Sequence, residues 1–169
     1  SMQICSCLVN PKACFETELT YEPTKAPKKI AVVGSGPAGL SCAVTAAERG
    51  HDVTLFESNH AIGGQLNYAR QVPGKQEFDE TIRYFSRQLE LKGVKVQLGK
   101  RVSVEDLQSG GFDEVVLATG IAPRKLDIEG SNHPKVLSYI EVLGEKKPVG
   151  KKVAIIGAGG IGFDVAEFL

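Results

Sequence analysis

The chain has 169 residues, of which 42% are hydrophobic and 19 are Gly, which is enough for one ordinary domain or slightly more. Lys and Arg together number 20, as do Asp and Glu, so no net charge draws the chain to nucleic acid or to an anionic membrane. No apolar stretch is long enough for a membrane span, and four Cys without a visible secretory leader favour a reducing compartment. We therefore expect a cytoplasmic protein.

The first 28 residues differ in character from the rest of the chain. They are polar, contain three Pro and show no sustained hydrophobic period, as a strap or linker does. Cys5, Cys7 and Cys14 fall close together there. Three thiols are one short of a usual zinc site, and a reducing compartment disfavours a disulfide. In a third interpretation, one thiol is a ligand of an iron–sulfur cluster whose other cysteines precede this sequence.

Residues 29–57 predict one βαβ unit. The β-branched run KKIAVV is typical of a buried parallel strand, GSGPAG follows it, LSCAVTAAERG is helical, and DVTLFE is a second strand. Gly50 stands where the helix should end.

The glycine loop of this unit has the pattern of a dinucleotide-binding fingerprint. Gly34 suits a tight turn, Gly36 lets a pyrophosphate approach the backbone, and Gly39 lets helix and strand pack closely. Glu57 closes the second strand near the spacing at which an acid binds a ribose hydroxyl. A single Gly-rich turn is weak evidence, but the full βαβ context makes an unrelated turn the poorer explanation.

The rest of the chain continues as an α/β protein. We expect, in order, a polar loop (58–75), a helix (76–92), a strand (94–98), a short helix (103–108), a strand (112–120), a connection (121–134) and a helix (136–143).

Residues 151–169 repeat the strand, glycine loop and helix about 120 residues after the first copy. Paired units of this kind resemble those of flavoproteins in which the first unit binds FAD and the second binds NAD(P)H. The resemblance implies that Gly157, Gly159 and Gly162 hold NAD(P)H, by the same physics. The sequence does not decide between NADP and NAD, because the discriminating residue would follow Leu169. We expect a piece of a longer protein with a parallel sheet and flanking helices, a Rossmann-like FAD/NAD(P)-binding fold that is truncated. Its predicted parts are a lead-in segment (1–28), the first part of the FAD domain (29–124), and a connection with the start of the NAD(P)H domain (125–169).

Two such units in series are typical of flavoproteins with paired dinucleotide domains, and two further motifs, AIGGQL (61–66) and VVLATG (115–120), match the pattern of those proteins. Together with SCLVNPKAC, IGGQLNYARQVPGK and HPKVLSYIEVL, they make the chain resemble the C-terminal part of NADPH-dependent 2,4-dienoyl-CoA reductase, a family also related to trimethylamine dehydrogenase.

The resemblance implies a relay of hydride from NADPH to FAD and then of electrons through a 4Fe–4S cluster to FMN, for reduction of an unsaturated fatty acyl-CoA in fatty acid β-oxidation. It places FMN and the acyl-CoA substrate on a separate barrel domain. It therefore implies that this chain contains no catalytic residue and has no turnover alone. It implies neither nucleic acid nor a membrane as partner. It makes Cys7 one ligand of the cluster. The FAD contacts that it implies are Gly34, Gly36, Ala38, Gly39, Glu57, Gln65, Lys75, Val102, Ala118, Thr119 and Gly120.

Three alternatives stay open. An amine dehydrogenase-like domain of the trimethylamine type would hold ADP in place of FAD. A thioredoxin-reductase-like disulfide reductase also uses GGQL, although the CLVNP segment argues against it. The third alternative is an inert nucleotide-binding fragment without activity of its own.

Overall fold

The structure, a computed structural model, describes residues 7, 10, 12–124 and 126–169. At its centre is a parallel sheet of four strands in the order β3-β2-β1-β4. These strands are β1 (Lys29–Val33), β2 (Asp52–Phe56), β3 (Lys95–Gln97) and β4 (Glu114–Leu117). The order reverses direction beside β1, so the carboxyl ends of β1 and β4 meet at the switch point where α/β sheets bind ligands. The predicted α/β fold with a parallel sheet is confirmed.

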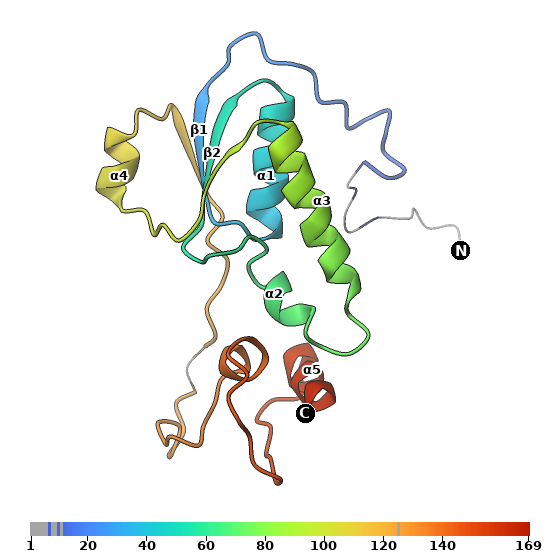
Figure 1. The fold of residues 1–169 in the computed structure, drawn as a ribbon, viewed down its shortest axis with the longest axis vertical. Coiled ribbons are helices and arrows are strands. Elements are labelled where there is room, and N and C mark those ends of the chain that lie inside the picture. The colour runs from blue at the N-terminus through green and yellow to red at the C-terminus, as the bar shows by residue number, and fades with distance from the viewer. Residues whose placement is uncertain (1–6, 8–9, 11, 125) are drawn as a thin grey trace.

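Helices flank this sheet. α1 (Pro37–Glu48) and α3 (Glu77–Leu91) lie together on one side of it, and α4 (Val104–Ser109) lies on the other (Figure 1). The main core fills the space between the sheet, α1 and α3. Its buried side chains are Ile30, Val32, Leu40, Ala43, Val44, Val53, Leu55, Phe85, Leu89 and Val94.

Local sequence signals account for the ends of these helices. Pro37 begins α1, where its missing N–H costs nothing, and Gly50 follows the end of α1 with a φ of 93°. Ser103 and Asp106 form a reciprocal capping box at the start of α4, in which each side chain accepts the other residue's backbone N–H.

Three expected elements differ in the structure. The loop predicted over 58–75 contains a short helix, α2 (Leu66–Ala69). The helix predicted over 136–143 is a single π-helical turn, η1 (Ile140–Gly144). The strand predicted over 151–156 does not form, and its Ile156 is 65% exposed. A strand needs a hydrogen-bonded neighbour, and no other described segment pairs with these residues.

A second, smaller core joins α2, η1 and α5 (Gly160–Phe168). Its buried side chains are Val72, Val142, Leu143 and Val165. Val72 precedes the domain boundary that we expect near residue 124, and the other three follow it. The connection and the second glycine motif therefore pack directly on the loop that follows β2.

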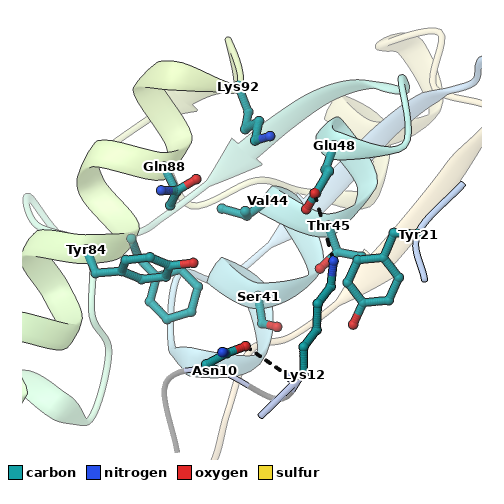
Figure 2. Close-up of a pocket in the computed structure, with 11 residues that line it drawn as sticks. Asn10, Lys12, Tyr21, Ser41, Val44, Thr45, Glu48, Tyr84, Gln88 and Lys92 are labelled. Atoms are coloured by element: carbon teal, nitrogen blue, oxygen red, sulfur yellow. Dashed lines mark hydrogen bonds and ion pairs between the residues drawn. The ribbon is translucent and has the colours of Figure 1, made fainter. Parts of the chain in front are cut away.

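The lead-in segment runs along α1, where the backbone N–H of Thr24 donates to the carbonyl of Arg49 at 2.7 Å. Between this segment, α1 and α3 lies a groove of about 220 Å³ that contains Lys12, Glu48 and Tyr84 (Figure 2). None of its lining residues belongs to a glycine motif. Among the described residues, no helix is long and apolar enough to cross a membrane.

Candidate functional site

Three predicted motifs meet at the carboxyl ends of β1 and β4. A Cβ added at Gly34 would overlap the backbone carbonyl of Ala118, so the first glycine loop lies directly against the ATG segment. The N–H of Gly63 donates to the carbonyl of Ser35 at 2.8 Å, and a Cβ added at Gly64 would lie 2.9 Å from the Cα of Gly36. The sequence separates these motifs by up to about 80 residues, and the fold makes them three walls of one site.

Each glycine of the first loop has the geometry that the fingerprint predicts. Gly34 has a φ of 104°, which an L side chain rarely adopts. A Cβ at Gly39 would overlap the carbonyl O of Gly34. A Cβ at Gly36, by contrast, would meet nothing within 4 Å. The open space at Gly36 lies where the N–H groups at the start of α1 can bind a phosphate.

Glu57 lies at this edge as an anion. Its side chain is 6% exposed, and its Oε2 accepts hydrogen bonds from the backbone N–H and the hydroxyl of Ser35, at 3.0 and 2.6 Å. Its Oε1 accepts from the backbone and side chain of Asn59 and, at 3.3 Å, from the hydroxyl of Ser58. Burial alone would raise the pKa of Glu57, but these donors outweigh it and lower the pKa. A ribose hydroxyl would compete most easily with Ser58, the most distant donor.

Ser35 is a site residue that the sequence reasoning missed. It is fully buried inside the first glycine loop, and both of its donors go to Glu57. The signal for it was a hydroxyl residue between two fingerprint glycines, where the second loop has Ala158. Ser35 ties the phosphate loop to the carboxylate expected at the ribose, so the two ends of the site are held in one geometry.

Gln65 lies between two walls of the site. Its Nε2 donates to the backbone carbonyl of Ile121 at 3.4 Å, and its Oε1 accepts from the hydroxyl of Tyr139 at 3.0 Å. Thr119 and Gly120 complete the segment just before Ile121, and Gly120 has a φ of 73°. Sequence reasoning missed Tyr139, because it lies in a connection without a nucleotide motif.

The other residues expected at FAD are less uniform. Ala38 is exposed beside Gly36 at the start of α1. Val102 is half-buried, and its backbone makes no hydrogen bond within the described residues. Lys75 forms an ion pair with Asp164 of α5, with Nζ 2.5 Å from Oδ1. This ion pair joins the segment just before α3 to the helix of the second glycine motif.

The second glycine loop copies the first in backbone geometry, even though its strand is absent. Gly157 has a φ of 116°, close to the value at Gly34, and a Cβ at Gly162 would overlap the carbonyl O of Gly157. Gly159 caps α5 with φ −86° and ψ 179°, as Gly36 caps α1 with −70° and 180°. The loop geometry is therefore local to G-x-G-x-x-G and does not need the sheet.

Of the three cysteines in the lead-in segment, the structure describes Cys7 and Cys14. Cys7 is exposed, and its Sγ accepts the backbone N–H of Asn10 at 3.4 Å. Cys14 is exposed with a φ of 66°, and Cys5 lies outside the described residues. Over the described part of the chain, no three His, Cys, Asp or Glu side chains are grouped so as to hold a metal ion.

These residues fit a bound dinucleotide. The space beside Gly36 is empty of protein atoms, and any side chain at this position would occupy it. The ionised carboxylate of Glu57 can accept hydrogen bonds from ribose hydroxyls. The buried Oδ1 of Asn67, beside Gly63, has no partner within the described chain. A buried acceptor without a partner in the protein is satisfied by a bound water or by a ligand atom.

The sequence and the fold both match known proteins. Residues 28–169 match the family described as Pyridine nucleotide-disulphide oxidoreductase. The chain is 41% identical over 169 residues to a cinnamate reductase of Clostridium sporogenes, with 97% of this chain and 24% of that protein covered.

Among solved structures, 2-naphthoyl-CoA reductase in complex with 2-naphthoyl-CoA superposes with a TM-score of 0.92 at 35% identity, over 96% of this chain and 25% of that one. Histamine dehydrogenase from Rhizobium sp. 4-9 superposes with a TM-score of 0.66 at 30% identity, over 73% of this chain and 19% of that one. The chain thus spans about a quarter of the length of these relatives or less.

Proposed function

Since this chain belongs to the pyridine nucleotide-disulphide oxidoreductase family, we propose that it is the FAD- and NAD(P)H-binding portion of a longer oxidoreductase that resembles 2,4-dienoyl-CoA reductase. The observation that carries the proposal is the meeting of three motifs around the open space at Gly36. A Gly-rich turn that served packing alone would need neither the approach of Gly64 nor a buried, ionised carboxylate at the end of β2.

In this proposal, different residues bind different parts of FAD. The N–H groups at the start of α1, beside Gly36 and Ala38, bind the pyrophosphate, and Glu57 accepts the adenosine ribose. The backbone of Val102 meets the adenine, and Gln65 with the segment 118–120 lies at the flavin. FAD supplies the redox chemistry when it is bound, and the chain holds and orients it.

The second glycine loop binds the nicotinamide nucleotide. Its agreement in backbone angles with the first loop supports a second pyrophosphate site at Gly157, Gly159 and Gly162. The resemblance favours NADPH. Lys75 stays a proposed contact on the flavin side, and its ion pair with Asp164 supports a second role in holding α5 against the segment before α3.

The proposed substrate is a conjugated alkene carried by a CoA thioester, reduced on another domain that holds FMN. The names of two relatives, cinnamate reductase and 2-naphthoyl-CoA reductase, support a conjugated acyl substrate. We place one ligand of a 4Fe–4S cluster at Cys7. The N–H of Asn10 directed at its sulfur supports this role, because such bonds stabilise a thiolate and tune a cluster.

An amine dehydrogenase-like protein that holds ADP is the second candidate, favoured by the likeness to histamine dehydrogenase. A visible absorption spectrum of the purified full-length protein separates the two. Bound FAD, extracted and identified together with FMN, and bleaching of the flavin by NADPH without air are the expected results. ADP in place of FAD, with bleaching by an amine alone, would overturn the proposal.

A substitution then assigns the cofactor to this site. Gly36→Val fills the open space, so we expect FAD to be lost while FMN is retained. Gly130→Ala is the control, because Gly130 lies in the connection and a Cβ there meets nothing within 4 Å, although its φ of 82° costs some local strain. Retention of FAD by Gly36→Val would show that the cofactor binds elsewhere.

A further inference from the structure

We propose that Tyr139 is a positioning residue, which fixes the orientation of the Gln65 amide at the flavin. This inference rests on the proposed function, since it takes Gln65 to lie beside bound FAD. It adds a residue from the connection between the two nucleotide-binding parts, in which no motif places a cofactor contact.

The hydrogen bonds leave the Gln65 amide one orientation. The backbone carbonyl of Ile121 can only accept, so the Nε2 end must face it, at 3.4 Å. The Oε1 end then faces Tyr139, whose hydroxyl donates to it at 3.0 Å. The carbonyl of Ile121 therefore decides which end of the amide is Nε2. The bond to Ile121 exceeds the usual N–H···O range, whereas the bond from Tyr139 lies within the O–H···O range, so Tyr139 makes the larger contribution to holding the amide in that orientation.

Packing holds the Tyr139 ring in place. It meets the ring of Tyr68 edge to face, with centroids 6.3 Å apart and planes at 79°. Both rings pack against the buried residues of the second core, Val142 and Leu143 among them. A Cβ at Gly144 would lie 2.6 Å from the Tyr68 ring, so η1 lies close against α2. The phenol is therefore carried by a fixed surface and not by a mobile loop.

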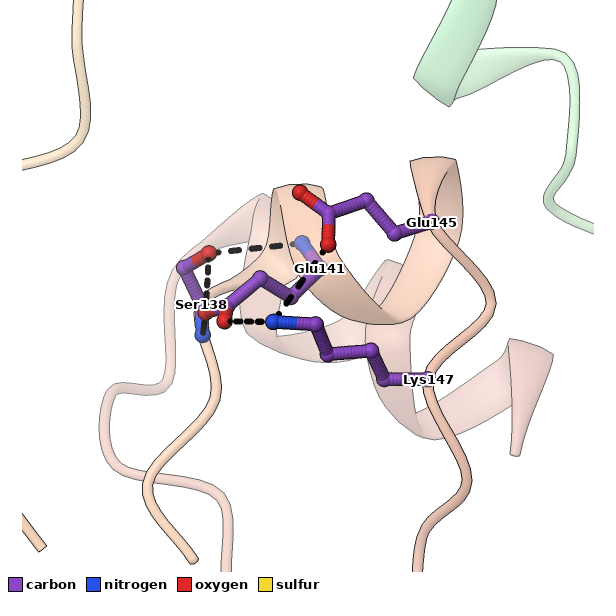
Figure 3. A network of polar contacts seen from close by, with 4 residues as sticks. All are labelled: Ser138, Glu141, Glu145 and Lys147. Atoms are coloured by element: carbon purple, nitrogen blue, oxygen red, sulfur yellow. Dashed lines mark hydrogen bonds and ion pairs between the residues drawn. The ribbon is translucent and has the colours of Figure 1, made fainter. Parts of the chain in front are cut away.

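A polar network holds the start of η1, next to Tyr139. The backbone and hydroxyl of Ser138 donate to Oε2 of Glu141, at 2.8 and 2.9 Å, while Lys147 pairs with Oε1 at 2.6 Å (Figure 3). The N–H of Glu145 donates to the carbonyl of Ile140, which is the wide π-type bond. Single π-helical turns are rare and are frequently found at functional sites.

The consequence concerns the remaining N–H of Gln65. Nε2 carries two N–H bonds, and Ile121 takes one of them. With the amide held by Tyr139, the other stays available as a donor at the site formed by Gly64 and the 118–120 segment. A fixed donor beside a flavin favours the reduced form, because electron density on the ring rises on reduction.

The test compares Tyr139→Phe with the parent in the flavin-loaded, full-length protein. Phe keeps the ring contact with Tyr68 and removes only the hydroxyl. We expect a lower midpoint potential of the FAD, by up to about 30 mV, which is a tenfold change in the equilibrium constant of a two-electron couple. We also expect FAD to dissociate roughly threefold to tenfold more readily, the effect of one lost hydrogen bond.

Two further variants separate positioning from general structure. Tyr84→Phe removes a phenol hydroxyl that makes no hydrogen bond within the described residues, and it should leave the FAD potential unchanged. In a Gln65→Met background, which lacks the amide, Tyr139→Phe should have no further effect on the potential.

The outcomes are distinct. A parent protein without FAD would overturn the proposed function and this inference with it. A parent that binds FAD, together with a Tyr139→Phe protein of unchanged potential and FAD affinity, would overturn the inference alone. An equal shift in the Gln65→Met background would also overturn it, because Tyr139 would then act without Gln65.

Discussion

Substitution of Gly39 by Ala tests whether the first loop needs a glycine for packing. Gly39 lies inside α1, where Ala is normally the better helix former by about 1 kcal/mol. An added Cβ would nevertheless overlap the carbonyl O of Gly34 and lie 3.3 Å from the Cβ of Ala118. The carbonyl belongs to the backbone of a residue with a φ of 104°, which has little freedom to move.

The two effects oppose each other, and the overlap should win. Overpacking in a filled site costs about 1–3 kcal/mol, and a Cβ that overlaps a constrained backbone carbonyl lies at the upper end of that range. After subtraction of the helix gain, we expect Gly39→Ala to lose roughly 1–2 kcal/mol of the free energy of unfolding. For a chain of this size, that lowers the melting temperature by about 2–8 °C.

Gly160→Ala is the matched control. Gly160 begins α5, and a Cβ there meets nothing within 4 Å, so this variant should be neutral or up to about 1 kcal/mol more stable. Urea unfolding followed by circular dichroism, without added nucleotide, measures both variants. Equal stability of Gly39→Ala and Gly160→Ala would refute the claim that the first loop is packed without room for a methyl group.

Two other predictions concern the carboxylates. Glu57→Gln places an amide N–H₂ or a neutral oxygen against the donors of Ser35, so we expect the free energy of unfolding in urea to fall by roughly 1–3 kcal/mol. The control Glu129→Gln changes an exposed side chain and should be neutral. Equal stability of the two variants would contradict the role of Glu57. The hydrogen bond with Lys147, followed by those from Ser138, lowers the pKa of Glu141 to about 2 from an ordinary value of 4.5. The lowered pKa means that Glu141 stabilises η1 fully above about pH 4.5, and that this stabilisation is lost as the pH falls toward 2. The protection factor of the Glu145 N–H, which is the intrinsic exchange rate divided by the observed rate at each pH, should fall over that range in the parent but not in Glu141→Gln. A protection factor of the parent that does not change with pH would count against the network.

Sequence patterns with local causes were predicted well. The glycine loop after β1, the helix that ends before Gly50 and the short helix predicted over 103–108 depend on a few neighbouring residues. The second glycine loop shows how local such a pattern is, since Gly157 and Gly159 adopt the backbone of the first loop without a strand before them.

Patterns that depend on distant partners were predicted poorly. The apolar run at 151–156 has the composition of a strand, but a strand also needs a neighbouring strand that pairs with its backbone groups. The hydrophobic pattern of a segment does not show whether such a neighbour is present. The helix expected over 136–143 is shortened to the π turn η1, which packs on Tyr68 from a segment about 70 residues earlier.

The sequence by itself determined the kind of site: which glycines turn the backbone, which carboxylate ends β2, and that two nucleotide loops occur in series. Those features follow from backbone sterics and from spacing, which the order of residues fixes. Only the tertiary structure decided that Ser35 holds Glu57, that Lys75 pairs with Asp164, and that Tyr139 reaches Gln65. Each of these contacts joins residues 22 to 89 positions apart, and their meeting depends on how the sheet, α2 and η1 pack in space.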